Sequence, residues 1–86
     1  MTHASHPAII RRLKRAEGHL RAIVGMFEEG RSCLDLAQQL HAVESAVSKA
    51  KRELIHDHIE NCLDEPESAL RGKGALTELK AITQYL

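Results

Sequence analysis

The sequence predicts a small all-α protein of three helices, and three observations lead to this fold class. Apolar residues recur at intervals of three and four along two long segments, which is the period of one helical face. The two prolines, Pro7 and Pro66, lie outside the interiors of these segments, and residues typical of strands are few. One Phe, one Tyr and no Trp leave Leu, Ile, Val and Ala to pack the core. With 86 residues, the chain is expected to form a single domain, 1–86, that is only marginally stable alone.

The first helix is expected to begin near Pro7, because proline is well tolerated in a first helical turn, and to end at Gly30. Residues 1–6 are expected to form a flexible tail. One buried stripe should run along this helix through the apolar residues Ile9, Leu13, Ala16, Leu20, Ile23 or Val24, and Phe27.

The second helix has a clear start, since Ser32 can cap it and Asp35 suits the positive end of its dipole. Nothing interrupts it before Pro66, so its thirty or so residues should span roughly 45 Å. Its predicted stripe consists of Leu36, Leu40, Val43, Val47, Ala50, Leu54, His58 and Cys62. A loop at 64–74 should lead to a short third helix, whose apolar side carries Leu76, Leu79, Ile82 or Thr83, and Leu86.

A hairpin of two such helices leaves too much apolar stripe exposed, so we expect two chains to form an antiparallel four-helix bundle. The net charge is zero, but residues 1–31 hold six basic side chains against three acidic ones, and 54–67 hold five acidic ones with no Lys or Arg. A basic end of this kind suits a face that meets phosphate.

No apolar run reaches membrane-spanning length and the N-terminus has no apolar signal region, so we expect a cytoplasmic protein with reduced thiols and no membrane partner.

The residues with the clearest chemistry are His58 and Cys62, which lie four apart and therefore on one helical face. A thiolate with an imidazole suits Cu(I), Zn(II) or Ni(II). Cys33 is the natural third ligand, although a lone cysteine is more often a small core residue. It lies twenty-nine positions before Cys62, about 44 Å along a straight helix, so the two thiols cannot meet within one chain.

Two copies of the second helix could bring these thiols together. If they pair antiparallel and cross near residues 47 and 48, Cys33 of one copy lies beside Cys62 of the other, and symmetry creates a second site. The residues expected at the crossing are Val43, Val47 and Ala50, with the small Ala46 and Ala50 allowing close approach. The spacing therefore predicts an intersubunit site with two sulfurs and one nitrogen.

Three segments carry a resemblance to a known family, and they are Arg12–Leu20, Ser32-Cys33 with Gln38-Gln39-Leu40, and His56–Cys62. Together they resemble the CsoR/RcnR family of metal-sensing repressors over roughly two thirds of the chain, from Ile9 to Cys62. The spacing Cys-x24-His-x3-Cys is the most diagnostic feature of that family.

The resemblance implies that Cys33, His58 and Cys62 are the metal ligands. Members with this Cys-His-Cys set typically bind Cu(I), whereas Ni(II) or Co(II) members usually add an N-terminal His and often replace the last Cys. Here the added position would fall near Met1, and His3 and His6 are out of register with it. Zn(II) is a further candidate ion. Persulfide-sensing relatives keep both cysteines but lack the His.

Two further positions are implied for coupling between metal and DNA. In copper-sensing relatives a Tyr before the first Cys and a Glu on the third helix surround the ligand His. Glu78 fits that Glu by spacing, although a solvated surface residue is an equal reading. Ser32 stands where the Tyr would be, with a shorter hydroxyl that is also wanted as a helix cap.

No helix-turn-helix, zinc-finger or ribbon pattern is visible. Arg12, Arg15 and His19 share one face of the first helix, and Lys49, Lys51 and Arg52 cluster on the second. By themselves these clusters read as solvated faces. The resemblance implies that they line the DNA-facing surface of a dimer-of-dimers tetramer, with Arg12, Lys49 and Arg52 as the matching positions.

The expected function is a homotetrameric repressor that binds operator DNA without metal and leaves it when Cu(I) binds, controlling a copper-export gene. A Ni(II)- or Co(II)-responsive repressor of the same family is an alternative. Two other classes stay open: a persulfide or redox switch joining Cys33 to Cys62 across the dimer, and a copper carrier or store without affinity for DNA. Three ligands with no flanking acid or base, and no sign of a small organic substrate, do not predict an enzyme.

Overall fold

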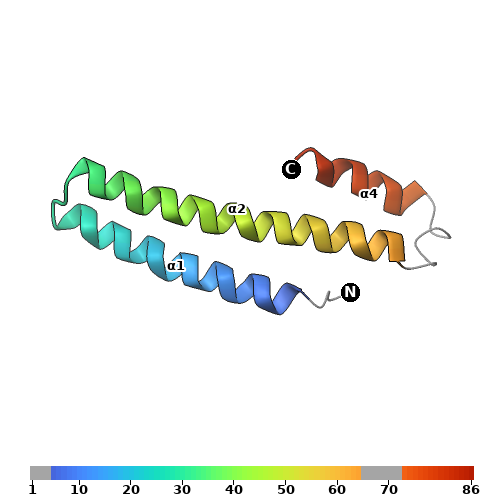
Figure 1. Cartoon of the computed structure of the whole chain (residues 1–86), viewed down its shortest axis with the longest axis horizontal. Coiled ribbons are helices and arrows are strands. Elements are labelled where there is room, and N and C mark those ends of the chain that lie inside the picture. Colours follow the sequence, from blue (N-terminus) through green and yellow to red (C-terminus); the bar gives the residue numbers. More distant parts are fainter. Residues whose placement is uncertain (1–4, 65–72) are drawn as a thin grey trace.

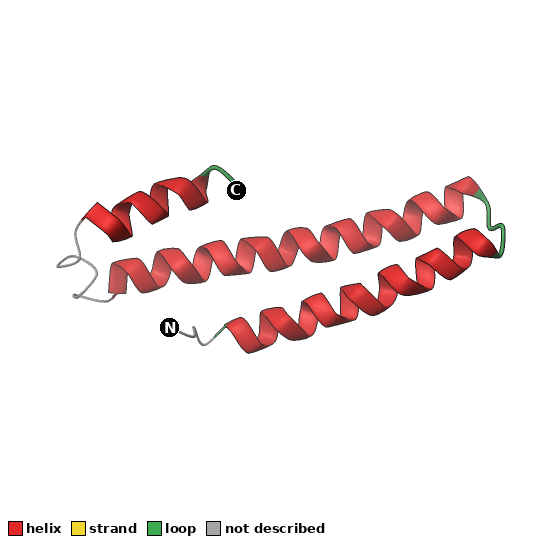
Figure 2. Ribbon diagram, turned by 180° about the vertical axis from the view of Figure 1, so that it is seen from behind, coloured by secondary structure: helices red, strands yellow, loops and turns green. Residues whose placement is uncertain are grey.

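The computed structural model describes residues 5–64 and 73–86, without the side chains of 62–64, 73, 75 and 76. Its helices are α1 (His6–Glu28), α2 (Cys33–Asp64) and α4 (Lys73–Thr83), and the described ranges contain no strand (Figure 2). The predicted all-α class with three helices is therefore confirmed. Helices α1 and α2 form a long antiparallel hairpin, and α4 lies along the second half of α2 (Figure 1). The molecule measures 57 × 23 × 14 Å, so it is elongated along α2.

Helix α1 begins one residue before Pro7, which occupies its first turn as predicted. His6 thus belongs to the helix and not to a tail, a correction to the expected 1–6 boundary, and residues 1–4 lie outside the described ranges. The helix starts because the Ile9 amide donates to the Ser5 carbonyl at 3.0 Å and Pro7 fixes a helical φ.

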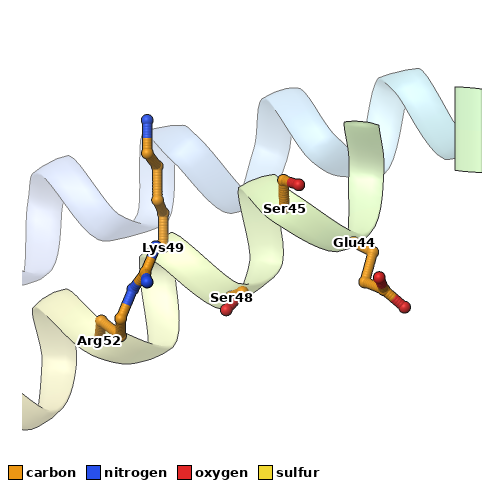
Figure 3. A pocket seen from close by; sticks show the side chains of 5 residues that line it. All are labelled: Glu44, Ser45, Ser48, Lys49 and Arg52. Carbon is orange, nitrogen blue, oxygen red and sulfur yellow. The ribbon is translucent and has the colours of Figure 1, made fainter. Parts of the chain in front are cut away.

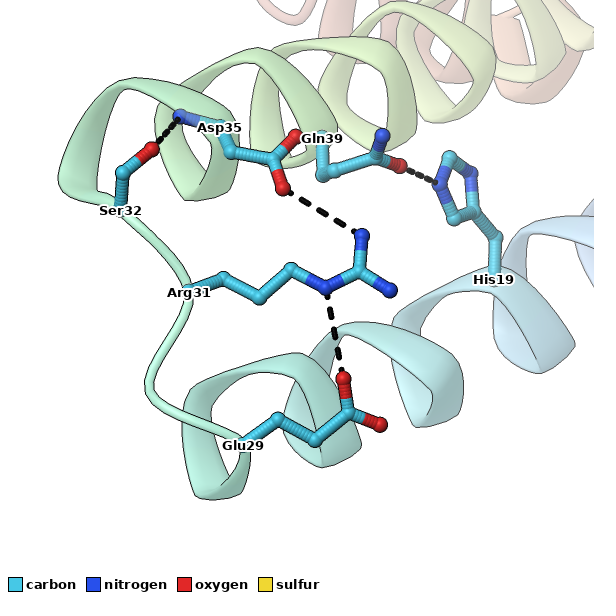
Figure 4. Close-up of polar contacts among 6 residues, drawn as sticks. All are labelled: His19, Glu29, Arg31, Ser32, Asp35 and Gln39. Atoms are coloured by element: carbon cyan, nitrogen blue, oxygen red, sulfur yellow. Dashed lines mark hydrogen bonds and ion pairs between the residues drawn. The ribbon is translucent and has the colours of Figure 1, made fainter.

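The turn between α1 and α2 confirms both predicted boundaries. Gly30 adopts a φ of 75°, a left-handed conformation that favours glycine. The Gly30 amide donates to the Phe27 carbonyl at 3.1 Å and the Arg31 amide donates to the Met26 carbonyl at 3.2 Å, the pair of bonds of a Schellman motif. Ser32 then caps α2, because its Oγ accepts a hydrogen bond from the Asp35 amide at 3.1 Å (Figure 4).

The predicted apolar stripes divide into a buried row and an exposed row. Residues seven apart face the other helix of the hairpin and are buried, and these are Ile9, Ala16, Ile23, Leu36, Val43 and Ala50. The other Leu, Val and Phe members are 42–54% exposed, namely Leu13, Leu20, Val24, Phe27, Leu40, Val47 and Leu54. This division agrees with the expectation that a hairpin of two such helices leaves much of its apolar stripe exposed, because a helix pair covers only the side chains along one line of contact.

Helix α4 covers a different side of α2. Ile55 of α2 is only 2% exposed, and Leu79 and Ile82 of α4 are half-buried, whereas Thr83 and Leu86 are exposed. The loop expected at 64–74 is shorter at both ends, since Asp64 closes α2 and Lys73 and Gly74 open α4. Residues 65–72 lie outside the described ranges. None of the described helices is both long and apolar enough to cross a bilayer.

Candidate metal centre and nucleic-acid interface

The predicted metal ligands lie at opposite ends of α2. Cys33 is the first residue of the helix, and its thiol is free and exposed. His58 is half-buried and Cys62 lies close to the helix end at Asp64. Because Cys33 precedes His58 by twenty-five positions, about 37 Å separate them along the axis, and one chain cannot bring them together. No group of three His, Cys, Asp or Glu side chains able to hold a metal occurs in the part of the chain that the structure describes.

The exposed row of α2 connects these two ends. Leu40, Val47 and Leu54 follow Cys33 at intervals of seven, so all four share one side of the helix. His58 comes one turn after Leu54. The three apolar members are 42%, 46% and 44% exposed. The candidate ligands therefore lie at the two ends of an apolar row that no other described helix covers.

The predicted crossing point needs one correction. Val43 and Ala50 are 8% and 3% exposed and belong to the row that packs against α1, so they are not available to a second α2 helix. Of the two small residues, Ala50 is buried against α1, whereas Ala46 is only half-buried. Val47 stays on the exposed row, and it lies at the midpoint between Cys33 and Cys62.

The open end of the hairpin places the start of α1 beside His58. His6 Nε2 lies 4.0 Å from Asp57 Oδ2, and Asp57 directly precedes His58. Asn61 donates to the Asp57 carbonyl at 2.7 Å and to its carboxylate at 3.2 Å. The Asp57 side chain is only 13% exposed, so these contacts join α1 to α2 within one turn of the candidate ligand. His3 lies outside the described residues.

The other end carries a cluster of charges around the turn. The Arg31 guanidinium donates to Asp35 Oδ2 and to Glu29 Oε2, both at 3.3 Å (Figure 4). The hydrogen bond to Asp35, followed by that to Glu29, raises the pKa of Arg31 above its ordinary value. Arg31 therefore stays protonated and keeps a positive charge two positions before Cys33.

The two residues predicted for coupling lie apart along the chain. Ser32 precedes Cys33, and its oxygen accepts the Asp35 amide, so the capping role expected from the sequence is realised. Glu78 lies in α4, the helix that packs on α2, and its side chain is exposed.

Two of the five predicted DNA contacts are engaged between the helices. Arg12 Nη2 donates to Glu53 Oε1 at 2.7 Å, and His19 Nε2 lies 2.7 Å from Gln39 Oε1. Figure 4 shows the imidazole of His19 reaching from α1 to the Gln39 amide of α2. These side chains thus help to hold the hairpin together. Sequence reasoning did not identify Glu53 and Gln39, since their partners lie 41 and 20 positions away.

The other three predicted contacts, Arg15, Lys49 and Arg52, are exposed. None of them forms an ion pair with a described residue. Lys49 and Arg52 border a shallow hollow on the outer side of α2, together with Glu44, Ser45 and Ser48 (Figure 3). Among the five predicted DNA contacts, the cations without an ion-pair partner among the described residues are therefore Lys49 and Arg52 in the middle of α2, and Arg15 on α1.

Comparison with known proteins identifies the family. The sequence profile of metal-sensitive transcriptional repressors matches residues 5–85. The copper-sensing transcriptional repressor CsoR of Mycobacterium ulcerans is 40% identical over 72 residues, which are 84% of this chain and 62% of that protein. CsoR of Bacillus subtilis is 37% identical over 71 residues, 83% of this chain and 70% of that protein. The chain thus spans less than two thirds of the length of its mycobacterial relative.

A solved structure shares the fold. The nickel-responsive transcriptional regulator InrS superposes with a TM-score of 0.81 and 28% sequence identity, over 99% of this chain and 96% of that one. The similarity of fold agrees with the match of the sequence profile along nearly the whole chain. The chain belongs to the family of metal-sensitive transcriptional repressors.

Proposed function

We propose that the protein is a copper-responsive transcriptional repressor, whose metal site forms between two copies of α2. The observation that carries this proposal is the exposed row Leu40, Val47 and Leu54, which has Cys33 at one end and His58 with Cys62 beyond the other. Its named relatives, the CsoR proteins, are copper-sensing repressors.

An antiparallel pair of α2 helices would bury the exposed apolar row and would also bring the three candidate ligands together. A two-fold axis near Val47 covers Leu40 of one copy with Leu54 of the other, and the same operation puts Cys33 beside the second copy's Cys62. Covering a half-exposed Leu or Val contributes about 1 kcal/mol, so six such residues in a dimer give a useful driving force. A dimer of dimers would then carry four copies of the basic surface, which together could contact an extended stretch of DNA phosphates.

The donor set fits Cu(I). Two thiolates and one imidazole are soft ligands, which Cu(I) accepts in preference to the oxygen ligands of hard cations. Cys33 of one copy, with His58 and Cys62 of the other, would hold the ion, and the bound ion would link the two α2 helices. The free Cys33 thiol suits a reducing cytoplasm, where we expect the protein to act.

DNA binding would be coupled to this site through the hairpin. His58 follows Asp57, which contacts His6 at the start of α1, and α1 carries Arg12 and Arg15. Reorientation of His58 toward the site would therefore shift α1 against α2 and misalign the basic surface. Metal and operator DNA then bind with negative, reciprocal coupling of about 1–3 kcal/mol.

The test is a titration of the reduced protein on labelled DNA from its own promoter region, with and without stoichiometric Cu(I) under anaerobic conditions. The proposal expects tight binding without the metal and roughly 5- to 150-fold weaker binding with it. His58→Ala should abolish the response while leaving metal-free DNA binding intact. Unchanged operator affinity in the presence of Cu(I) would refute the proposal. Copper binding without salt-dependent DNA affinity would instead identify a carrier or store.

A nickel-responsive repressor is the second candidate, and the position of His6 favours it over a persulfide switch, which needs no nitrogen ligand. His6 lies at the same end of the hairpin as His58, next to Asp57, so a fourth ligand, which would be the second nitrogen ligand, is within the same region of the chain. InrS, with which the fold superposes, is nickel-responsive. If nickel is the signal, His6→Ala lowers Ni(II) affinity strongly, and Ni(II) in place of Cu(I) releases the operator.

A further inference from the structure

The exposed row of α2 has a second row of residues beside it on the same side of the helix. Counted from Cys33 in steps of four and three, the two rows together form one strip, which we call the seam. Its members are Cys33, Ala37, Leu40, Glu44, Val47, Lys51, Leu54 and His58. All of them are exposed in the single chain except the half-buried His58. The seam is therefore the side of α2 that a second copy would cover in the proposed dimer.

The seam contains one basic residue, Lys51, which has no acidic partner in its own chain. Lys51 is exposed and forms no ion pair with any residue in 5–64 or 73–86. On a helix, the residues three and four positions away are the ones within reach. For Lys51 these are Val47, Ser48, Leu54 and Ile55. Its charge is therefore available to an acidic group of another chain.

The seam also contains one acidic residue, Glu44, which is only loosely engaged. Glu44 Oε1 lies 3.9 Å from His41 Nδ1, but the two side chains are 82% and 78% exposed, so water screens this contact. In Figure 3 the Glu44 carboxylate is directed away from Lys49 and Arg52. Neither of these cations of the outer side of α2 therefore neutralises it.

The two-fold operation of the proposed dimer brings the two charges of the seam together. If residue 33 of one α2 helix meets residue 62 of the other, residue 44 meets residue 51 in the same antiparallel register, and symmetry repeats the contact beyond the axis. Residue 37 meets residue 58, so the small Ala37 faces the candidate ligand His58. The register that assembles the metal ligands is thus also the register that pairs Glu44 with Lys51 twice.

The apolar residues of the seam do not select this register by themselves. Leu40, Val47 and Leu54 recur every seven positions, so sliding one helix by seven residues only exchanges one apolar contact of Val47 for another. Sliding in one direction places the Glu44 carboxylates of the two copies against each other, and sliding in the other direction does the same to the two Lys51 ammonium groups. Like charges face each other in both cases, so both slips are disfavoured.

We propose that Glu44 and Lys51 form two symmetry-related ion pairs between paired α2 helices, and that these pairs fix the register at which Cys33 meets Cys62. The partner of this surface is a second copy of the chain. The assignment rests on the proposed function, from which it takes the antiparallel pairing of α2. Charges beside an apolar helix interface set partner choice and orientation while adding little affinity in water. A slip by one heptad would move Cys33 about 10 Å from Cys62, so the register decides whether a metal site exists.

Charge reversal tests the pairs, because each single exchange turns both attractions into repulsions. In a dimer of Glu44→Lys chains both contacts join two cations, and in a dimer of Lys51→Glu chains both join two anions. Each variant should associate at least about tenfold more weakly than the parent chain. A mixed dimer of the two variants has opposite charges at both contacts, and so has a dimer of the doubly exchanged chain. Association should therefore return in the mixture and in the double variant.

Sedimentation velocity of the reduced, metal-free chain measures association at about 0.1 M and about 1 M salt, since the higher concentration screens charges beyond about 3 Å. The register is measured separately, as the yield of dimer joined through Cys33 and Cys62 after brief treatment with the thiol oxidant diamide. Chains that lack either cysteine reveal cross-links of any other kind. Lys14→Glu is the matched control, because Lys14 is exposed and lies on α1, outside the seam. Circular dichroism of each variant checks the fold.

The outcomes separate the ion pairs from the proposed function. The pairs are supported if both single reversals lower association and cross-linking at low salt, while the mixture and the double variant recover them. They are overturned, with the shared interface still standing, if the parent chain cross-links and the reversed chains do so equally well. Failure of both the mixture and the double variant to recover, or an equal loss in Lys14→Glu, also overturns them. A parent chain that is monomeric, or that forms no Cys33–Cys62 cross-link, refutes the shared metal site of the proposed function itself.

Discussion

Arg12 of α1 and Glu53 of α2 form a 2.7 Å ion pair across the hairpin, although 41 positions separate them in the sequence. Their side chains are 36% and 39% exposed, so water screens the pair. We predict that Arg12→Gln and Glu53→Gln each lower the free energy of unfolding by about 0.5–1 kcal/mol, and that the double variant loses less than the sum. Urea denaturation of the four proteins measures the coupling. Strict additivity would show that the pair contributes nothing.

The intersubunit metal site predicts complementation between two inactive variants. Cys33→Ala and Cys62→Ala should each lose tight Cu(I) binding, since each removes one thiolate from every site. In a mixed dimer, however, the Cys33→Ala chain still supplies His58 and Cys62, and the Cys62→Ala chain supplies Cys33. One intact site should therefore reappear per mixed dimer, measured by competition with a chromophoric Cu(I) chelator. If the two variants are refolded together and tight Cu(I) binding does not return, the antiparallel pairing of α2 is wrong.

The exposed row of α2 predicts a change in oligomeric state. Val47→Asp puts a charge at the centre of the row, where burying it in an interface would cost several kcal/mol. We expect this variant to sediment as a monomer at concentrations where the parent chain is oligomeric. Ala22→Asp, on an exposed part of α1, serves as the control and should leave the mass unchanged. A Val47→Asp protein of unchanged mass would place the interface elsewhere.

Two glycines predict opposite effects of the same substitution. Gly30→Ala should destabilise the protein by about 1–2 kcal/mol, because a residue with a Cβ is strained at a φ of 75° whatever the surrounding space. Gly18 lies inside α1, and a Cβ there meets nothing within 4 Å. Gly18→Ala should therefore stabilise by about 0.5–1 kcal/mol through helix propensity. Thermal unfolding at fixed protein concentration gives both signs, and equal signs would contradict the turn geometry.

Ser32 is expected to act on stability and not on metal response. Its hydroxyl oxygen accepts the Asp35 amide at 3.1 Å, so Ser32→Ala removes the cap of α2 and costs about 1 kcal/mol. We predict that the ratio of DNA affinities with and without Cu(I) is unchanged in this variant. Ser32→Thr, which keeps a hydroxyl, is the control for the cap. A lost copper response in Ser32→Ala alone would assign the hydroxyl to the coupling network that the family resemblance implies.

The helices and their ends could be read from the sequence because their signals are local. Pro7, Gly30 and Ser32 each act within one turn of where they stand, and the structure has all three in the predicted roles. The division of the apolar stripes was not predictable in the same way. Val43 and Val47 lie one turn apart with the same chemistry, and only the position of α1 decides which one is buried.

For the candidate site, too, the sequence predicted what depends on spacing along one helix, and not what depends on the position of the neighbouring helix. Spacing alone shows that Cys33 and Cys62 cannot meet within one straight helix, and the structure places Cys33 and His58 at opposite ends of α2. A site shared with a second chain stays a prediction. The involvement of Arg12 with Glu53, and of His19 with Gln39, depends on the register of two helices and leaves no local trace. For the same reason, a basic face on one helix did not reveal which of its members are already paired.

The tight turn at Gly30 also orders the assembly of the hairpin in time. The His19–Gln39 contact closes a loop of 20 positions and the Arg12–Glu53 contact one of 41, and each doubling of loop length costs about 0.6 kcal/mol of closure entropy. The hairpin should therefore zip from the turn outward, with the His6–Asp57 end joined last and opened first. His58 lies at this late-closing end. A ligand that binds there therefore acts on the part of the hairpin with the lowest free energy of local opening, while the capped turn beside Cys33 stays closed.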